Sequence, residues 1–314
     1  MSMKKQLLMF LLMTAVSAAN AQSRMDTIRL ADPTIFYDNR TYYLYGTGSP
    51  DGFAVYTSND LENWKREDKP ALLKSDSYGL KSFWAPQVFK YRGKYYMAYA
   101  ADEHIAIAVS DSPLGPFTQR VHQPITEPGK QIDPFIFKDA DGKLYLYHVR
   151  LDKGNRIYVA RLKDDLSDID SSTLMECIHA DQGWENTAAS GWPVAEGPTV
   201  TKINNLYYLF YSANDFRNID YAVGYATSAS PTGPWTKYMG NPILSRKNTG
   251  QNGSGHGDLF TTKNGELFYV FHTHSSENGV GQRKTAVVKL SNLGQNPAVI
   301  SVVPGTFHYL QIKN

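Results

Sequence analysis

Short apolar runs and polar turns alternate along almost the whole chain, and one arrangement of them occurs five times. A run that starts beside a proline or a glycine is followed by a tight polar turn and then by a second run rich in aromatic residues. Aromatic and β-branched residues favour strands, and two such runs across a short turn favour a β-hairpin. The five predicted hairpins span residues 32–46, 85–99, 133–147, 197–211 and 256–271.

The spacing of these hairpins predicts the fold. Their first residues are 53, 48, 64 and 59 positions apart, and further strand-like runs follow several of them, at residues 53–57, 105–109 and 222–227. A repeat of about fifty residues with three or four strands is typical of a β-propeller blade. We therefore predict an all-β protein with a single domain, a five-bladed β-propeller. The alternative is a β-sandwich with similar hairpins, but a sandwich gives no reason for five repeats.

The first residues have a different pattern. Lys4 and Lys5 precede an apolar stretch over residues 7–16, and small residues follow up to Ala21. A positive start, a short apolar middle and an Ala-x-Ala end are typical of a secretory signal peptide, and the stretch is too short to span a bilayer as a helix. We predict that residues 1–21 are removed on export to the periplasm or the extracellular space. Residues 22–314 then form the propeller, without a membrane span.

Composition narrows the class of protein. Lys and Arg number 32 against 30 Asp and Glu, which gives a net charge of +2. Nucleic-acid-binding proteins normally carry a strong basic excess, so the balance argues against that class. Aromatic residues make up 13% of the chain, which suits a strand-rich fold and the stacking of sugar rings. The single cysteine, Cys177, excludes an intrachain disulfide. Propellers of this size are often monomers, and we expect a monomer here.

The candidate chemistry lies at the start of each hairpin. The first strand of a propeller blade lines the central axis, so residues at equivalent positions in the five repeats converge on one pocket. These positions hold Asp32, Ala85, Asp133, Gly197 (with Glu196 before it) and His256. Burying three acids near an axis is costly unless they are paired or functional. A single Asp before a proline often caps a turn, but three acids at equivalent positions favour a functional site.

Hydrolysis of a glycosidic bond needs this set of groups. One carboxylic acid protonates the leaving oxygen, and one carboxylate activates a water on the opposite face of the sugar; in inverting enzymes the two lie roughly 6.5–9.5 Å apart. A third carboxylate nearby raises the pKa of the acid by like-charge repulsion. Blades across a narrow funnel suit this separation. The pattern therefore predicts an inverting glycosidase whose chemistry requires no cofactor.

At these motifs the sequence resembles glycoside hydrolase family forty-three, a family of inverting five-bladed propellers that act on arabinose- and xylose-containing polysaccharides. The resemblance covers the whole mature chain. It rests on Ala31-Asp32-Pro33, Trp84-Ala85-Pro86, Ile132-Asp133-Pro134 and Ala195-Glu196-Gly197-Pro198, which follow one another at the spacing of blades. Related invertase-type propellers, which retain configuration, carry Glu-Cys at the acid position. The Glu-Gly pair found here argues against them.

The resemblance implies a role for each acid. Asp32 matches the general base of the family, Glu196 matches its general acid, and Asp133 matches the aspartate that modulates the pKa of the acid and orients the substrate. All three are acids of the predicted inner strands, so the roles implied by the resemblance agree with the chemistry inferred from the repeat.

Three further residues are implied to bind substrate. His256 matches a histidine of the fifth blade that lies beside a bound calcium or a water network, Arg283 matches an arginine near the acid pair, and Trp84 is a candidate platform for a sugar ring. The alternatives are a hydrogen-bonded axial histidine without metal, a solvated arginine at a strand end and a tryptophan in the core. A structural calcium at the axis is implied through His256 alone.

The predicted activity is hydrolysis of O-glycosyl bonds in plant oligo- or polysaccharides, with α-L-arabinofuranosidase as the first interpretation. β-Xylosidase, endo-arabinanase and β-galactosidase are alternatives on the same fold. An alternative from another class is a catalytically inactive glycan-binding propeller, but a pure binding protein has no need of both Asp32 and Glu196. The loop over residues 180–193 carries Trp184 and Trp192 and leads to Glu196, so we expect it to wall the site.

Overall fold

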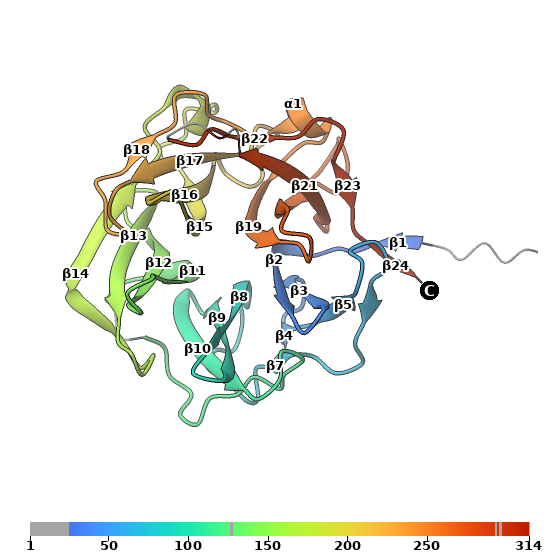
Figure 1. The fold of residues 1–314 in the computed structure, drawn as a ribbon, viewed down its shortest axis with the longest axis vertical. Coiled ribbons are helices and arrows are strands. Elements are labelled where there is room, and N and C mark those ends of the chain that lie inside the picture. Colours follow the sequence, from blue (N-terminus) through green and yellow to red (C-terminus); the bar gives the residue numbers. More distant parts are fainter. Residues whose placement is uncertain (1–24, 126–127, 293, 295–296, 314) are drawn as a thin grey trace, which may run out of the picture.

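The computed structural model describes residues 25–125, 128–292, 294 and 297–313. The predicted signal peptide, residues 1–21, lies outside this part of the chain. The described residues are almost entirely β-strand, and their main sheets stand around a central axis in the order in which they occur in the sequence (Figure 1). The predicted all-β fold, a single-domain five-bladed β-propeller, is confirmed. None of the helices described is long and apolar enough to cross a membrane.

Each blade is an antiparallel sheet that runs outward from the axis. Blade 1 contains β2 (Ala31–Asp38), β3 (Thr41–Thr47), β5 (Tyr56–Ser58) and β6 (Lys65–Arg66), and blade 2 contains β8 (Trp84–Tyr91), β9 (Lys94–Ala101) and β10 (His104–Ser110). Blade 3 contains β11 (Gln131–Lys138), β12 (Leu144–Leu151), β13 (Asn155–Leu162) and β14 (Ile169–Ile178). Blade 4 contains β15 (Ala195–Ile203), β16 (Leu206–Ala213), β17 (Ala222–Ser228) and β18 (Thr236–Lys237). Blade 5 contains β19 (Gly255–Thr261), β20 (Leu267–Thr273), β21 (Lys284–Asn292), β22 (Ile300–Val302) and β23 (His308–Tyr309).

Four short strands and two short helical segments complete the described part of the chain. β4 (Gly52–Phe53) pairs with β7 (Leu72–Leu73), and β1 (Met25–Thr27) pairs with β24 (Gln311–Lys313). The helical segments are a 3-10 turn, η1 (Gly183–Glu185), and one short helix, α1 (Arg246–Thr249). Both lie in loops outside the blades.

Aromatic side chains form the core between neighbouring blades. Five buried clusters lie one in each interface around the ring. Between blades 1 and 2, for example, the rings of Phe83 and Tyr99 stack with centroids 5.9 Å apart, and Phe53 meets both edge-on. Such pairs contribute about 0.5–1.5 kcal/mol each beyond the area that they bury. The high aromatic content therefore serves mainly to pack blade against blade.

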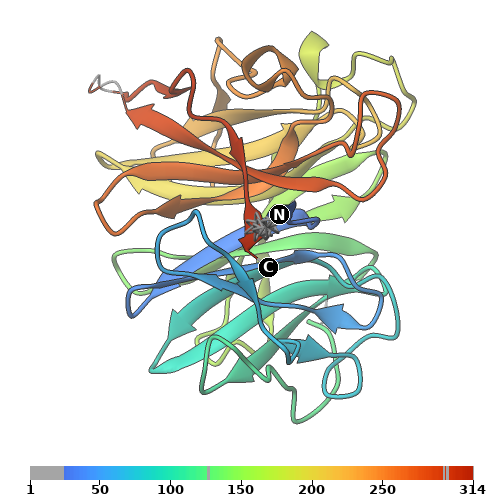
Figure 2. The same ribbon diagram turned by 90° about the vertical axis from the view of Figure 1, so that its right-hand side faces the viewer.

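The two ends of the described chain close the ring. β1 and β24 are antiparallel, with Met25 opposite Lys313, and they lie together at one side of the propeller (Figure 2). Next to them, the Ile28 amide donates to the Leu310 carbonyl (2.9 Å), and the Thr285 amide donates to the Ile28 carbonyl (3.0 Å). The segment before blade 1 is thus bound to blade 5 and to the end of the chain, while every blade keeps its own consecutive strands.

Candidate active site

The innermost strand of every blade contains a β-bulge at the same position. Its pairing with the second strand shifts register there in all five blades. A residue in each bulge has a left-handed φ, and these residues are Asp32 (49°), Ala85 (43°), Asp133 (55°), Gly197 (59°) and His256 (42°). They are the five positions that the repeat aligns in the sequence. Because a bulge bends a strand and re-aims its side chains, the alignment corresponds to a real structural equivalence.

In four of the five blades, a side chain of the preceding blade accepts the hydrogen bond of the bulge amide. The amide of Ala85 donates to Thr47 Oγ1 (2.9 Å), that of Gly197 to Asp133 Oδ2 (3.1 Å), that of His256 to Ser212 Oγ (2.7 Å) and that of Asp32 to His272 Nδ1 (3.1 Å). A left-handed conformation costs roughly 1–2 kcal/mol at a residue other than glycine, and a buried amide needs a partner. These bonds offset part of that cost and join adjacent blades at the depth of the site.

One cavity at this end of the axis collects the candidate residues. It has a volume of about 580 Å³, which is within the range of ligand pockets. All six residues singled out from the sequence line it, namely Asp32, Trp84, Asp133, Glu196, His256 and Arg283. The three acids are buried, with exposed fractions of 8% for Asp32, 5% for Asp133 and 8% for Glu196. The structure therefore brings residues from all five blades and the loop before β21 to one place.

Asp32 is surrounded by groups that favour its ionised form. Its Oδ1 lies 3.2 Å from Arg283 Nη1 and 3.4 Å from Nδ1 of both His256 and His272, and its Oδ2 accepts a hydrogen bond from Thr47 Oγ1 (2.7 Å). Burial alone would raise the pKa of Asp32, but Arg283, the two histidines and Thr47 outweigh it and hold the pKa well below its usual range. Burial lowers the pKa of both histidines. Arg283 is therefore the lasting positive charge beside Asp32.

Glu196 has the opposite environment. Its Oε1 accepts from the Tyr221 hydroxyl (2.8 Å) and its Oε2 from Asn155 Nδ2 (2.7 Å). Burial raises the pKa of Glu196 to about 7, because it outweighs these two hydrogen bonds and is helped by the charges of Asp32 and Asp215. Glu196 thus holds a proton at a pH where Asp32 is fully ionised.

Asp133 belongs to blade 3, whereas Asp32 belongs to blade 1 and Glu196 to blade 4. Its Oδ2 accepts the Gly197 amide and lies 3.9 Å from His256 Nδ1. Burial, then the charge of Glu196 and that of Asp32, raise the pKa of Asp133 well above its usual range. Glu196 and Asp133 resist ionising together, so the pair keeps at least one proton near neutral pH.

Several residues in or beside the cavity carry no signal in the repeat. Asn155 and Tyr221 bond directly to Glu196. The Arg283 guanidinium lies over the Phe216 ring, and its Cζ is 4.7 Å from the ring centroid. They lie on strand ends and loops outside the aligned hairpins, so no motif points to them. Trp192 from the loop over residues 180–193 lines the cavity, as expected of that loop.

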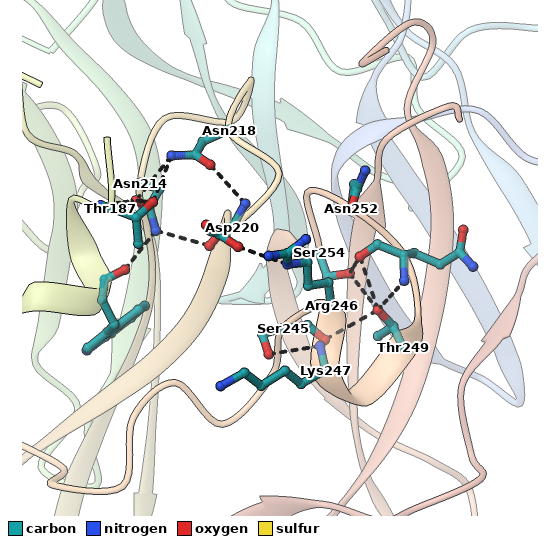
Figure 3. A network of polar contacts seen from close by, with 12 residues as sticks. Thr187, Asn214, Asn218, Asp220, Ser245, Arg246, Lys247, Thr249, Asn252 and Ser254 are labelled. Atoms are coloured by element: carbon teal, nitrogen blue, oxygen red, sulfur yellow. Dashed lines mark hydrogen bonds and ion pairs between the residues drawn. The ribbon is translucent and has the colours of Figure 1, made fainter. Parts of the chain in front are cut away.

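Buried Asn214 ties two loops of this wall together (Figure 3). It follows β16, and its amide nitrogen donates to the carbonyls of Trp184 (2.8 Å) and Asp220 (3.0 Å), while its amide oxygen accepts the Thr187 amide (2.8 Å). Asp220 in turn pairs with Arg246 of α1 at 2.9 Å. Trp184 packs its ring against Tyr211 and contributes to this support, whereas Trp192 faces the cavity.

The surroundings of His256 do not fit a calcium cage built from side chains. Calcium takes six to eight oxygen ligands, and no group of three or more His, Cys, Asp or Glu side chains able to hold a metal exists among the described residues. The imidazole Nδ1 instead faces Asp32 and Asp133 at 3.4 and 3.9 Å. The proton transfers need no metal, and the calcium expected from the resemblance stays a prediction.

Comparison with known proteins agrees with this geometry. A family model described as glycosyl hydrolases family 43 matches residues 26–291. The crystal structure of an endo-1,4-β-xylanase from Bacteroides thetaiotaomicron is similar, with a TM-score of 0.87 and 42% identity, over 93% of this chain and 100% of that one. A xylosidase/arabinosidase of Humicola insolens is 30% identical over 69% of this chain and 73% of its own length. A β-D-galactofuranosidase of Aspergillus niger is 25% identical over 83% of this chain and 79% of its own length. The protein is therefore a glycoside hydrolase, and the chain belongs to glycosyl hydrolases family 43.

Proposed function

We propose that this enzyme is an exported, inverting pentosidase of plant polysaccharides, with Asp32 as general base, Glu196 as general acid and Asp133 as modulator of the acid. One observation carries the proposal: two buried carboxyls in one cavity have pKa values displaced in opposite directions. Such a pair is what acid–base catalysis at neutral pH needs, since one group must take a proton while the other gives one.

The proposed reaction is a single displacement. Asp32 removes a proton from water as that water attacks the anomeric carbon, and Glu196 gives its proton to the leaving oxygen on the other side. Asp32 and Glu196 come from blades 1 and 4 and share no hydrogen-bond partner among those described. This supports a gap wide enough for water. Arg283 keeps Asp32 ionised, and all these groups come from one chain, so a monomer suffices.

The first candidate substrate is an α-L-arabinofuranoside. The Humicola relative is named a xylosidase/arabinosidase, and the Aspergillus relative acts on a sugar in the furanose form. The second candidate is a β-xyloside, which the 42% identical endo-1,4-β-xylanase structure favours. Endo-arabinanase and β-galactosidase activity complete the set to be tested. Export is supported by the predicted signal peptide at residues 1–21 and by the polymeric nature of such substrates.

Product analysis tests both the substrate and the mechanism. We expect hydrolysis of aryl α-L-arabinofuranoside or aryl β-D-xyloside, and proton NMR should detect a first-formed sugar with the anomeric configuration opposite to that of the substrate. A product that keeps the configuration would refute inversion. Arabinan or arabinoxylan that binds without release of sugar would favour the glycan-binding alternative.

Two conservative variants test the roles. Glu196→Gln and Asp32→Asn keep the shape of the side chains, and we expect each to lose most of the activity while the protein stays folded. A substrate with a good leaving group should partly restore Glu196→Gln, because it needs little help from an acid, and should not restore Asp32→Asn. Restoration of Asp32→Asn instead would show that the two roles are reversed.

A further inference from the structure

Two side chains connect the wall of the cavity to Glu196. Trp192, in the loop before β15, donates its indole Nε1–H to Asn155 Oδ1 (2.9 Å). Asn155, the first residue of β13, donates from Nδ2 to Glu196 Oε2 (2.7 Å). All three residues line the same cavity. A continuous chain of hydrogen bonds therefore runs from a half-exposed tryptophan on the rim to a buried carboxyl.

The chemistry of the tryptophan determines the orientation of the amide. An indole N–H donates and cannot accept, and an Asn side chain has a donor end and an acceptor end. The Asn155 oxygen must therefore face Trp192, which leaves the NH₂ group to face Glu196. Asn155 is only 9% exposed, so water is a poor substitute for either partner.

The backbone brings the same segments together. The Asn155 amide donates to the Pro193 carbonyl (2.9 Å), and Asn155 forms a parallel bridge with Val194, just before the strand that carries Glu196. Gly154 permits this approach. It has a φ of 127°, and a Cβ atom there would lie 2.4 Å from the Pro193 oxygen. The placement of Asn155 beside Glu196 is thus fixed by main chain and side chain together.

We propose that Asn155 is a positioning residue for the proton of Glu196, and that Trp192 acts through Asn155. Because Oε2 accepts the Asn155 amide, the neutral carboxyl carries its proton on Oε1, from which the leaving oxygen receives it. The Tyr221 hydroxyl, 2.8 Å from Oε1, can accept from the protonated form and donate to the ionised form. This inference rests on the proposed function, in which Glu196 is the general acid.

The variant Trp192→Phe tests the role of the indole N–H, because it keeps an aromatic ring at the cavity wall. Without that donor the Asn155 amide is free to turn its oxygen toward Glu196 and to hold the proton on Oε2. We expect kcat to fall about tenfold while KM stays within about twofold. The alkaline limb of the pH–rate profile should move up by about one pH unit, because a hydrogen bond that favours the ionised acid is lost. A substrate with a good leaving group should lose much less activity.

Asn155→Ala should move the alkaline limb in the same direction. If Trp192 acts through Asn155, the double variant Asn155→Ala/Trp192→Phe should show no further shift. Should Asn155→Ala fail to fold, Trp192→Phe still decides, because Trp192 is 47% exposed and the substitution leaves no large void. Additive shifts in the double variant would overturn the proposal.

Trp184→Phe is the matched control. Trp184 lies on the same loop, and its indole N–H donates to Gln182 Oε1 at 2.9 Å, so the variant removes the same kind of bond away from Asn155. Its alkaline limb should stay in place. The proposal fails if Trp192→Phe leaves the limb unmoved or if Trp184→Phe moves it equally. Glu196→Gln separates a failure of this inference from a failure of the proposed function. Full activity in that variant would overturn the assignment of Glu196 as the acid, whatever the Asn155 variants show.

Discussion

Replacing Asp133 by asparagine removes one ionisable carboxyl from the axis and keeps the shape of the side chain. The Gly197 amide, now 3.1 Å from Asp133 Oδ2, can donate to the asparagine oxygen instead. The bulge that carries Glu196 therefore stays supported. The main change is electrostatic, because the charge of Glu196 raises the pKa of Asp133, and by the same repulsion a charge on Asp133 disfavours ionisation of Glu196.

The size of the effect follows from the environment of Glu196. Its pKa is about 7, with burial as the leading cause, and burial is unchanged in the variant. If loss of the neighbouring charge lowers this pKa by about one unit, the protonated fraction at pH 7 falls from about a half to about a tenth. We expect kcat/KM to fall about fivefold at pH 7 from titration alone and very little at pH 5.

The assay is kcat/KM for an aryl glycoside measured from acid to alkaline pH in the wild type and in Asp133→Asn. Asp258→Asn is the control. Asp258 is also buried, two residues after His256 in β19, but its carboxylate accepts from the hydroxyls of Thr34 (2.7 Å) and Thr199 (2.6 Å). The alkaline limb of the pH–rate profile of Asp258→Asn should not move. A uniform loss at every pH in Asp133→Asn would refute the electrostatic role and leave Asp133 a role in binding only.

Four further outcomes are expected. Arg283→Met should raise the pKa of Asp32, so the acid limb of the pH–rate profile should move up by about 1–3 units; an unmoved limb would contradict this. Glu185→Gln removes the buried charge that pairs with Lys237 at 2.7 Å; a loss of about 3 kcal/mol should lower the calorimetric Tm by roughly 6–12 °C. Gly154→Ala should lower both Tm and kcat, because the added methyl meets a backbone oxygen. Treatment with a chelator tests the calcium implied at the axis: a drop in Tm would reveal a bound metal, and an unchanged Tm would contradict that calcium.

The inner hairpins could be predicted because all five have the same local structure. A strand enters the axis, makes a bulge with a left-handed residue and continues to a tight turn, and Asp32 and Asp133 occupy that bulge just before a proline. The same residue types recur at the same offset, so the sequence aligns. Glu196 precedes its bulge residue by one position, because Gly197 occupies the bulge itself, where a Cβ would lie 2.9 Å from the His256 ring.

The partners of Glu196 could not be predicted in the same way. Asn155 reaches it because blade 3 and the loop before blade 4 pair in parallel at one bridge, and Tyr221 reaches it from the start of the segment that leads to β17. These contacts depend on how neighbouring blades approach each other, and no repeated residue marks them. The aromatic content also had two interpretations, and the structure assigns most of it to packing between blades.

The pairing of β1 with β24 has a consequence for biosynthesis. Blades form from consecutive strands, so each can fold before the rest of the chain is in place. The partner of residues 25–28, however, lies at residues 310–313 and is made only after all five blades. Closure over so long a chain costs little extra entropy, since that cost grows only with the logarithm of length. Until it happens the nascent protein is an open arc with an unpaired strand edge, the kind of edge that invites aggregation.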